Sequence, residues 1–178
     1  MTFEDAKQGL LAGDFSRLDP LFITTPDMVS EIVRWHGLGL FAEEPRALAE
    51  AFTCACFNGR NDVVDYLLAQ GVHPDGGRET GFTAFHWAAN RGQLPTVQRL
   101  IQAGASLEIR NSYGGTVLGC AVWSLFNEPR PDHLAIIENL LQAGARADEL
   151  PEATGDARLD ELLRRFRQAP PQGGAGSS

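Results

Sequence analysis

The sequence has few cysteines and no long apolar stretch. Its three cysteines, Cys54, Cys56 and Cys120, are an odd number, which argues against a secreted disulfide framework and fits a reducing compartment. No apolar run reaches the roughly 18 residues of a membrane-spanning helix. The first residues, MTFEDAKQGLL, lack the basic and apolar regions of a signal peptide. We therefore expect a cytoplasmic protein that does not associate with membranes.

Basic residues are also scarce. The chain has 15 Lys and Arg against 23 Asp and Glu, a formal net charge of -8, which repels phosphate backbones unless a local basic patch overrides it. The one tight basic cluster is preceded by acidic residues at helical spacing, which predicts a solvated, salt-bridged face; its members are Arg164, Arg165 and Arg167, and the acids are Asp156, Asp160 and Glu161. The sequence thus predicts no nucleic-acid partner.

Catalytic and metal-binding motifs are missing as well. The chain has no phosphate-binding loop of the Walker type, no G-x-S-x-G and no H-E-x-x-H. His86 has no evident base or nucleophile beside it, and Cys54 and Cys56, two apart on a helix, point to different faces. We predict a non-enzyme without cofactor or metal. An enzyme or metal-dependent protein using Cys54, Cys56 and His86 is the alternative, which metal analysis and thiol labelling would distinguish.

An internal repeat is the main positive feature. Ala55, Ala88 and Ala121 are spaced 33 residues apart, and neighbouring positions follow in step. Apolar columns and glycines recur in the same register: Phe52, Phe85 and Leu118; Cys54, Trp87 and Cys120; Gly59 and Gly92; Val64 and Val97; Gly71, Gly104 and Gly144. A fixed period of this length is typical of stacked repeat architectures.

Each copy divides into two short helices and a turn. TAFHWAANRG begins with Thr83 as a helix cap and ends at Gly92, and LPTVQRLIQAGA has Pro95 in its first turn and ends at Gly104. The stretch 106–115 then predicts a hairpin-like turn. The third copy is seven residues longer around SLFNEPRPDH, where two prolines predict an enlarged loop.

Such helices are too short to be stable alone and need stacked neighbours. The alanine column lets adjacent helices approach closely, whereas a larger side chain would strain the stack. We interpret the cysteines as small apolar core residues.

The segment GFTAFHWAANRGQLPTVQRLIQAGASLE resembles the ankyrin repeat. Ten positions match its pattern: Gly81, Thr83, His86, Ala88, Ala89, Gly92, Val97, Leu100, Gly104 and Ala105. The third copy has Gly119 where the pattern has histidine, and the first has EAFT, residues 50–53, in place of TPLH. The resemblance covers about residues 45–150 and implies an all-α solenoid of stacked helix-turn-helix units joined by β-hairpin-like turns. It also implies that His86 hydrogen-bonds within the hairpin and the helix start.

The flanks are expected to cap this stack. Thr2 and Asp5 form the pattern of a capping box, and TPDMVSEIVRWHG predicts a helix from Thr25 as N-cap through Pro26 to Gly37. A stripe of Leu159, Leu162, Leu163 and Phe166 predicts a terminal amphipathic helix. We divide the chain into an N-terminal cap with a degenerate repeat (1–44), three repeats (45–77, 78–110 and 111–150), a capping helix (151–168) and a disordered tail (169–178).

The resemblance implies a protein-binding surface along the hairpin tips and the ends of the first helices. In this register the surface residues are Phe57, Asn58, Glu79, Thr80, Phe82, Asn90, Arg91, Ser112, Tyr113 and Trp123. Exposed aromatic residues with an arginine are typical of interface anchors. The alternative is that Phe57 and Trp123 only pack under neighbouring hairpins.

The favoured function is an adaptor or inhibitor of bacterial type, of which an immunity or antitoxin-like protein is one form. Its net negative charge would suit a basic partner protein. We expect a monomer; self-association through an uncapped end is the competing possibility.

Overall fold

The structure, a computed structural model, describes residues 1–168. This part of the chain contains ten α-helices, one short 3-10 helix and no strand. The elements are α1 (Phe3–Ala12), α2 (Phe15–Leu18), η1 (Asp19–Phe22), α3 (Glu31–Gly37), α4 (Pro45–Asn58), α5 (Asn61–Ala69), α6 (Ala84–Asn90), α7 (Leu94–Gln102), α8 (Val117–Asn127), α9 (His133–Gln142) and α10 (Ala157–Gln168).

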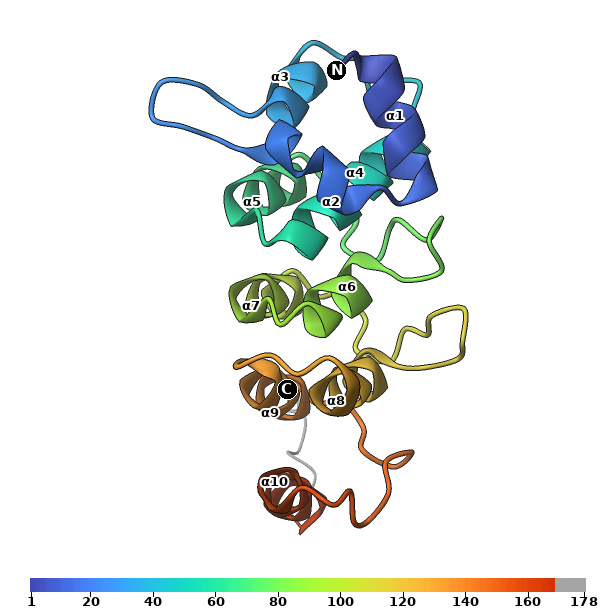
Figure 1. The fold of residues 1–178 in the computed structure, drawn as a ribbon, viewed down its shortest axis with the longest axis vertical. Helices are drawn as coiled ribbons and strands as arrows, with labels where there is room; N and C mark the ends of the chain where they lie inside the picture. The colour runs from blue at the N-terminus through green and yellow to red at the C-terminus, as the bar shows by residue number, and fades with distance from the viewer. Residues whose placement is uncertain (169–178) are drawn as a thin grey trace, which may run out of the picture.

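The helices form two parallel rows in an elongated stack (Figure 1). The inner row consists of α1, α4, α6 and α8, and the outer row of α3, α5, α7 and α9, each helix contacting the next in its row. The loops that join one helix pair to the next project on the side of the inner row (Figure 1). The all-α stack expected from the repeat is therefore confirmed.

Local capping explains where the helices begin and end. The Thr83 hydroxyl accepts a hydrogen bond from the His86 amide at 3.4 Å, and the Thr116 hydroxyl accepts one from the Gly119 amide at 3.1 Å. Gly92 has a φ of 71°, the left-handed conformation that ends a helix and disfavours a side chain. The predicted caps at Thr83 and Gly92 are both present.

The core runs along the seam between the rows. Ala55, Ala88 and Ala121 are fully buried, as the repeat predicted, and α4, α6 and α8 contact one another in order. The three cysteines are buried and unpaired, which confirms their interpretation as small core residues.

The N-terminal segment differs from the prediction in one place. α3 starts after Ser30, whose hydroxyl accepts a hydrogen bond from the Val33 amide at 3.3 Å, so the expected N-cap at Thr25 was wrong. Thr25 instead pairs with Met28 across a tight turn, because Pro26 between them sets a turn conformation. Met28, in this turn, is exposed, whereas Ile32 and Trp35 of α3 are buried.

The start of the chain agrees with the prediction. Thr2 and Asp5 form the expected capping box at the beginning of α1. α1 packs on α4 and α3 packs on α5, so the two extend the two rows by one layer.

The insertion in the third copy is only partly a loop. α8 has 11 residues where α6 has 7, so about one turn of the insertion is helical, and residues 128–132 form the connection to α9. Both prolines of the insertion, Pro129 and Pro131, lie in that connection. Proline has no backbone N–H to donate and disfavours a helical conformation in the residue before it. α8 therefore ends shortly before Pro129.

The C-terminal helix α10 packs on α9. Its predicted stripe is confirmed, with Leu159, Leu162 and Leu163 buried and Phe166 half-buried. Of the expected ion pairs only Arg164 with Glu161 is present; Arg165 pairs instead with Glu138 of α9, and Arg167 donates to backbone carbonyls. The expected salt-bridged face is therefore present only in part. The predicted tail, 169–178, lies outside the described residues.

Candidate functional site

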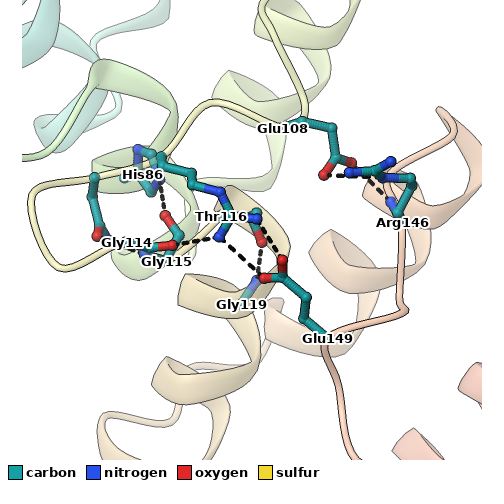
Figure 2. Close-up of polar contacts among 10 residues, drawn as sticks. His86, Glu108, Gly114, Gly115, Thr116, Gly119, Arg146 and Glu149 are labelled. Atoms are coloured by element: carbon teal, nitrogen blue, oxygen red, sulfur yellow. Dashed lines mark hydrogen bonds and ion pairs between the residues drawn. The ribbon is translucent and has the colours of Figure 1, made fainter.

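The second hairpin, residues 103–116, is fixed to the inner row by His86. The His86 Nε2 lies 3.0 Å from the Gly115 carbonyl oxygen (Figure 2), and its Nδ1 lies 2.8 Å from the Thr83 hydroxyl. Because a carbonyl only accepts, Nε2 carries the proton and Nδ1 accepts from the hydroxyl. Burial lowers the pKa of His86, which favours this neutral form.

The same hairpin is tied to the turn that follows α9. Arg110 donates to the Gly114 carbonyl at 2.6 Å and pairs with Glu149, and the Arg146 amide donates to Glu108 at 2.9 Å (Figure 2). The third copy has Gly119 where the second has His86, so no histidine at this position can bond to the turn after α9. The contacts of Arg110 and Glu108 hold that turn instead.

The first hairpin, residues 70–83, is fixed in another way. Buried Glu50 accepts a hydrogen bond from the Glu79 amide at 2.8 Å, and the Glu79 carboxylate pairs with Arg46 at 2.6 Å. The two tips are joined by the Ser112 amide, which donates to the Gly81 carbonyl at 2.8 Å. The predicted residues Glu79 and Ser112 therefore lie at the tips, as expected, and both are held by neighbours.

Five aromatic side chains form a continuous row from the N-terminal layer to the second tip. Successive ring centroids lie 5.6, 5.2, 5.0 and 5.8 Å apart; the members of this aromatic row are Phe15, Phe57, Trp87, Phe82 and Tyr113. Edge-to-face and tilted pairs at these distances are favourable. The row unites three predicted surface residues with Phe15 and Trp87, which were not predicted to lie at the surface.

The exposure of the row increases toward the second tip. Phe15 is buried, Phe57, Trp87 and Phe82 are half-buried, and Tyr113 is 84% exposed. Thr80, also predicted to lie at the surface, accepts a hydrogen bond from the Trp87 Nε1 at 3.0 Å. The indole is thus fixed at the surface by a tip residue.

Arg91 lies against this row. Its guanidinium carbon is 4.7 Å from the centroid of the Phe57 ring, a cation–π geometry. Phe57 is itself wedged between Phe15 and Trp87, so the expectation that it only packs under a hairpin describes it incompletely. Its ring also supports a surface arginine.

Two exposed aromatic residues lie on α8, in the next layer. Trp123 is 53% exposed and Phe126 is 47% exposed. Trp123 was predicted, and its exposure argues against a role confined to packing. Phe126 was missed, although its position three residues after Trp123 places both on adjoining parts of one helix face.

Two other predicted residues serve internal contacts. The Asn58 amide donates to the Phe15 carbonyl at 3.0 Å. Asn90 is buried and donates to the Ser124 hydroxyl at 2.9 Å, while its carbonyl accepts from His133 Nε2 at 3.0 Å. Both side chains connect layers of the stack; Asn90 is not presented at the surface, whereas Asn58 is half-buried.

The residues of the enzymatic alternative do not converge. Cys54 Sγ points to the Phe15 carbonyl, Cys56 is fully buried, and both ring nitrogens of His86 have partners. Burial raises the pKa of Cys54 and Cys56 and raises that of Cys120 to about 12, so the thiols are protonated at neutral pH. Within residues 1–168 no three His, Cys, Asp or Glu side chains are grouped to hold a metal ion.

Two hollows in the surface are lined by residues outside the aromatic row. An open depression of about 710 Å³ borders α1, and a smaller one of about 310 Å³ borders α10. The exposed aromatic residues Tyr113, Trp123 and Phe126 line neither of these hollows. Among residues 1–168, none of the helices has both the length and the apolar composition needed to span a bilayer.

Comparison with known proteins gives one matching family. A family model described as ankyrin repeats, in three copies, matches residues 50–149. Two similar proteins are palmitoyltransferases: AKR1 of Kluyveromyces lactis, 33% identical over 82 residues (46% of this chain and 11% of that protein), and Hip14 of Drosophila melanogaster, 39% identical over 61 residues (34% and 10%). A third is the ankyrin repeat domain-containing protein SAT10 of Stachybotrys chartarum, 34% identical over 110 residues (58% and 5%).

The chain thus spans about a tenth or less of the length of these relatives. All three come from eukaryotes, so they lend no support to the bacterial type expected from the sequence, which stays a prediction.

Proposed function

The chain belongs to the ankyrin repeat family, whose repeats form protein-interaction modules, and on this premise we propose that it binds a partner protein through the aromatic row and the hairpin tips. It acts as an adaptor or inhibitor without catalysis of its own. The observation that carries the proposal is the exposure of Tyr113 and Trp123, at 84% and 53%. Large exposed aromatic residues beside an arginine are the usual anchors of protein interfaces.

The tips are held in place before any partner arrives. His86, Glu50 and the Ser112 amide each fix a tip by a hydrogen bond. A preorganised surface loses little conformational entropy on binding, so more of the contact energy becomes affinity. This supports recognition by a largely rigid surface.

We further propose that the three repeats, 45–150, form the binding unit, with residues 1–44 and 151–168 as caps. The protein works as a monomer in the cytoplasm, where its three free thiols would stay reduced. Palmitoyl transfer, named for two relatives, is not proposed, because the matched stretches span only 11% and 10% of those proteins.

A basic partner, as for an immunity or antitoxin-like inhibitor, is the version suggested by the net charge of -8. Electrostatic attraction of that kind weakens strongly as salt screens it. Complex formation at low and at high salt therefore tests this version, and a complex that is insensitive to salt contradicts it.

The central test is affinity capture with the full chain from cells of its native host. Three baits are compared: the wild type, a Tyr113→Ala/Trp123→Ala double variant, and Leu38→Ala, which removes an equally exposed apolar side chain (64%) from the N-terminal end. We expect one partner to bind the wild type and the Leu38 control and to be lost from the double variant, all three having similar melting temperatures. Equal capture by all baits contradicts the proposed surface.

Metal analysis and thiol labelling of the purified chain test the enzymatic alternative. Mass measurement in solution separates a monomer from an assembly that forms through an uncapped end.

A further inference from the structure

Arg91 is an arginine without a counter-charge. Within the described residues it forms no ion pair, whereas most other basic side chains do. Its guanidinium lies on the Phe57 ring, which orients the planar group but leaves its N–H donors free. Phe57 is fixed by Phe15 and Trp87 on either side. The guanidinium is therefore presented on a rigid platform.

A second arginine without an ion pair in residues 1–168 lies next to it. The aliphatic stem of Arg130 covers Gly92, since a Cβ added to Gly92 would come within 2.8 Å of the Arg130 Cβ. Arg130 is exposed, and its loop is anchored by His133, whose Nδ1 accepts from the Arg130 amide at 3.1 Å. Arg91 and Arg130 thus flank Gly92, and we call them the arginine pair.

The negative charge of the chain is concentrated elsewhere. Outside the loop that carries Arg130, exposed carboxylates without an ion pair in the described part of the chain lie on α5 or toward the two ends of the stack: Asp5, Asp27, Glu43, Asp62, Asp148 and Glu152. At the first tip, Glu79 is neutralised by Arg46. The net charge of -8 therefore does not describe the surface around the arginine pair.

The acids of the loop that carries Arg130 are the local exception. Glu128 and Asp132 are exposed and form no ion pair with either arginine in the described structure. Glu128 and Asp132 each lie two residues from Arg130 in the same loop, so their negative charges oppose the positive charge of that arginine. They would compete with any acidic group that binds there.

We propose that this surface binds an acidic linear segment of the partner protein. Carboxylates of the segment pair with Arg91 and Arg130, since an arginine fork fits a carboxylate bidentately, and an adjacent apolar side chain contacts Trp123 and Phe126. The inference rests on the proposed function and adds the chemistry of the partner. It replaces the basic partner expected from the net charge, because local, unpaired charges determine which groups can make contact.

A selection with defined probes tests this. A phage-displayed library of random linear peptides is selected against the full chain, and enriched peptides are synthesised and titrated by fluorescence anisotropy. The variants are Arg91→Gln, Arg130→Gln, Glu128→Gln and Phe57→Leu. The matched control, Arg34→Gln, removes an exposed arginine on α3 that is already paired with Glu31.

We expect peptides rich in Asp and Glu beside an aromatic or aliphatic residue. Arg91→Gln should weaken them about tenfold, as loss of a charged anchor does, and Arg130→Gln should act in the same direction. Glu128→Gln should strengthen binding, Phe57→Leu should weaken it by freeing the guanidinium, and Arg34→Gln should leave it unchanged. The melting temperature of each variant shows whether a loss reflects unfolding.

Basic or neutral peptides, the absence of any enriched peptide, or acidic peptides that bind Arg91→Gln as well as the wild type would overturn the inference. The Tyr113→Ala/Trp123→Ala variant separates its failure from that of the proposed function. Peptides that bind that variant more weakly, but bind Arg91→Gln as well as the wild type, contradict only the proposal that the partner segment is acidic. Peptides insensitive to both contradict the surface itself.

Discussion

The Glu50 carboxylate accepts a hydrogen bond from the Glu79 amide at 2.8 Å across 29 residues of sequence. His86 reaches the Gly115 carbonyl across the same number of residues. Both bonds fix a hairpin tip to the inner row, one through a buried acid and the other through a buried imidazole. The second oxygen of Glu50, Oε2, is buried without a partner, which makes the ionised acid costly in this place.

Glu50→Gln should therefore raise the melting temperature at pH 8. Burial raises the pKa of Glu50 above its usual 4.5, so the native state favours the protonated acid. The stability that the folded protein gains from protonated Glu50 is fully present below pH 4.5 and is lost as the pH rises through the folded-state pKa. The gain from glutamine should accordingly be large at pH 8 and small at pH 4.5. Thermal melts at both values, with exposed Glu43→Gln as control, check this; a lower melting temperature at pH 8 contradicts it.

His86 should give the opposite pH dependence. Burial lowers its pKa below the usual 6.5, so its contribution to stability is complete above pH 6.5 and is lost as the pH falls through the folded-state pKa. The free energy of unfolding from urea titrations should fall more between pH 7.5 and 5.5 for the wild type than for His86→Gln. Leu38→Ala, which removes an exposed side chain and no titratable group, should behave like the wild type. Equal slopes for all three proteins would exclude His86 as the source.

Ala88→Leu should destabilise the stack by about 1 to 3 kcal/mol, as overpacking of a close-packed core does. Ala88 is fully buried on α6, which contacts both α4 and α8, so the larger side chain has no room. Ala69→Leu places the same change at an exposed helical position. Urea unfolding of both variants measures the difference, and an unchanged free energy for Ala88→Leu would count against the close approach of the helices.

His133→Ala should cost about 1 to 3 kcal/mol, the range for leaving buried polar groups unpaired. His133 is fully buried, and it joins the Arg130 amide to the Asn90 carbonyl. Its loss should therefore loosen residues 128–132 as well. Hydrogen exchange at the Arg130 amide reports this directly; unchanged protection there would show that the loop is held by other contacts.

Tyr113→Ala should change the free energy of unfolding by less than about 0.5 kcal/mol, as is usual for exposed positions, yet weaken partner binding. Tyr113 is 84% exposed, and its ring centroid lies 5.8 Å from the centroid of the Phe82 ring. Urea unfolding and titration with the captured partner measure the two effects separately. Full affinity would remove Tyr113 from the site, and marked unfolding would assign it a structural role.

The repeat, its caps and its buried columns could be read from the sequence. Thr83 caps a helix through an amide three residues away, and Gly92 ends it by its own backbone conformation. Such determinants are local, so the identity and spacing of neighbouring residues suffice. The predicted helix start at Thr25 was wrong, because Ser30 is a second candidate N-cap nearby. A turn and a helix start use similar residues, so the sequence alone did not distinguish them.

What the side chains do between layers was decided only by the tertiary structure. Asn90 and Arg91 are adjacent in sequence and were given the same role, yet Asn90 is buried against Ser124 while Arg91 lies on the ring of Phe57. The Glu50 contact and three of the four pairs of the aromatic row likewise join residues 29 or more positions apart. A periodic sequence determines that layers stack, because each must bury its apolar face. Which side chains meet across a layer depends on the distance and orientation of those layers, which only the folded stack provides.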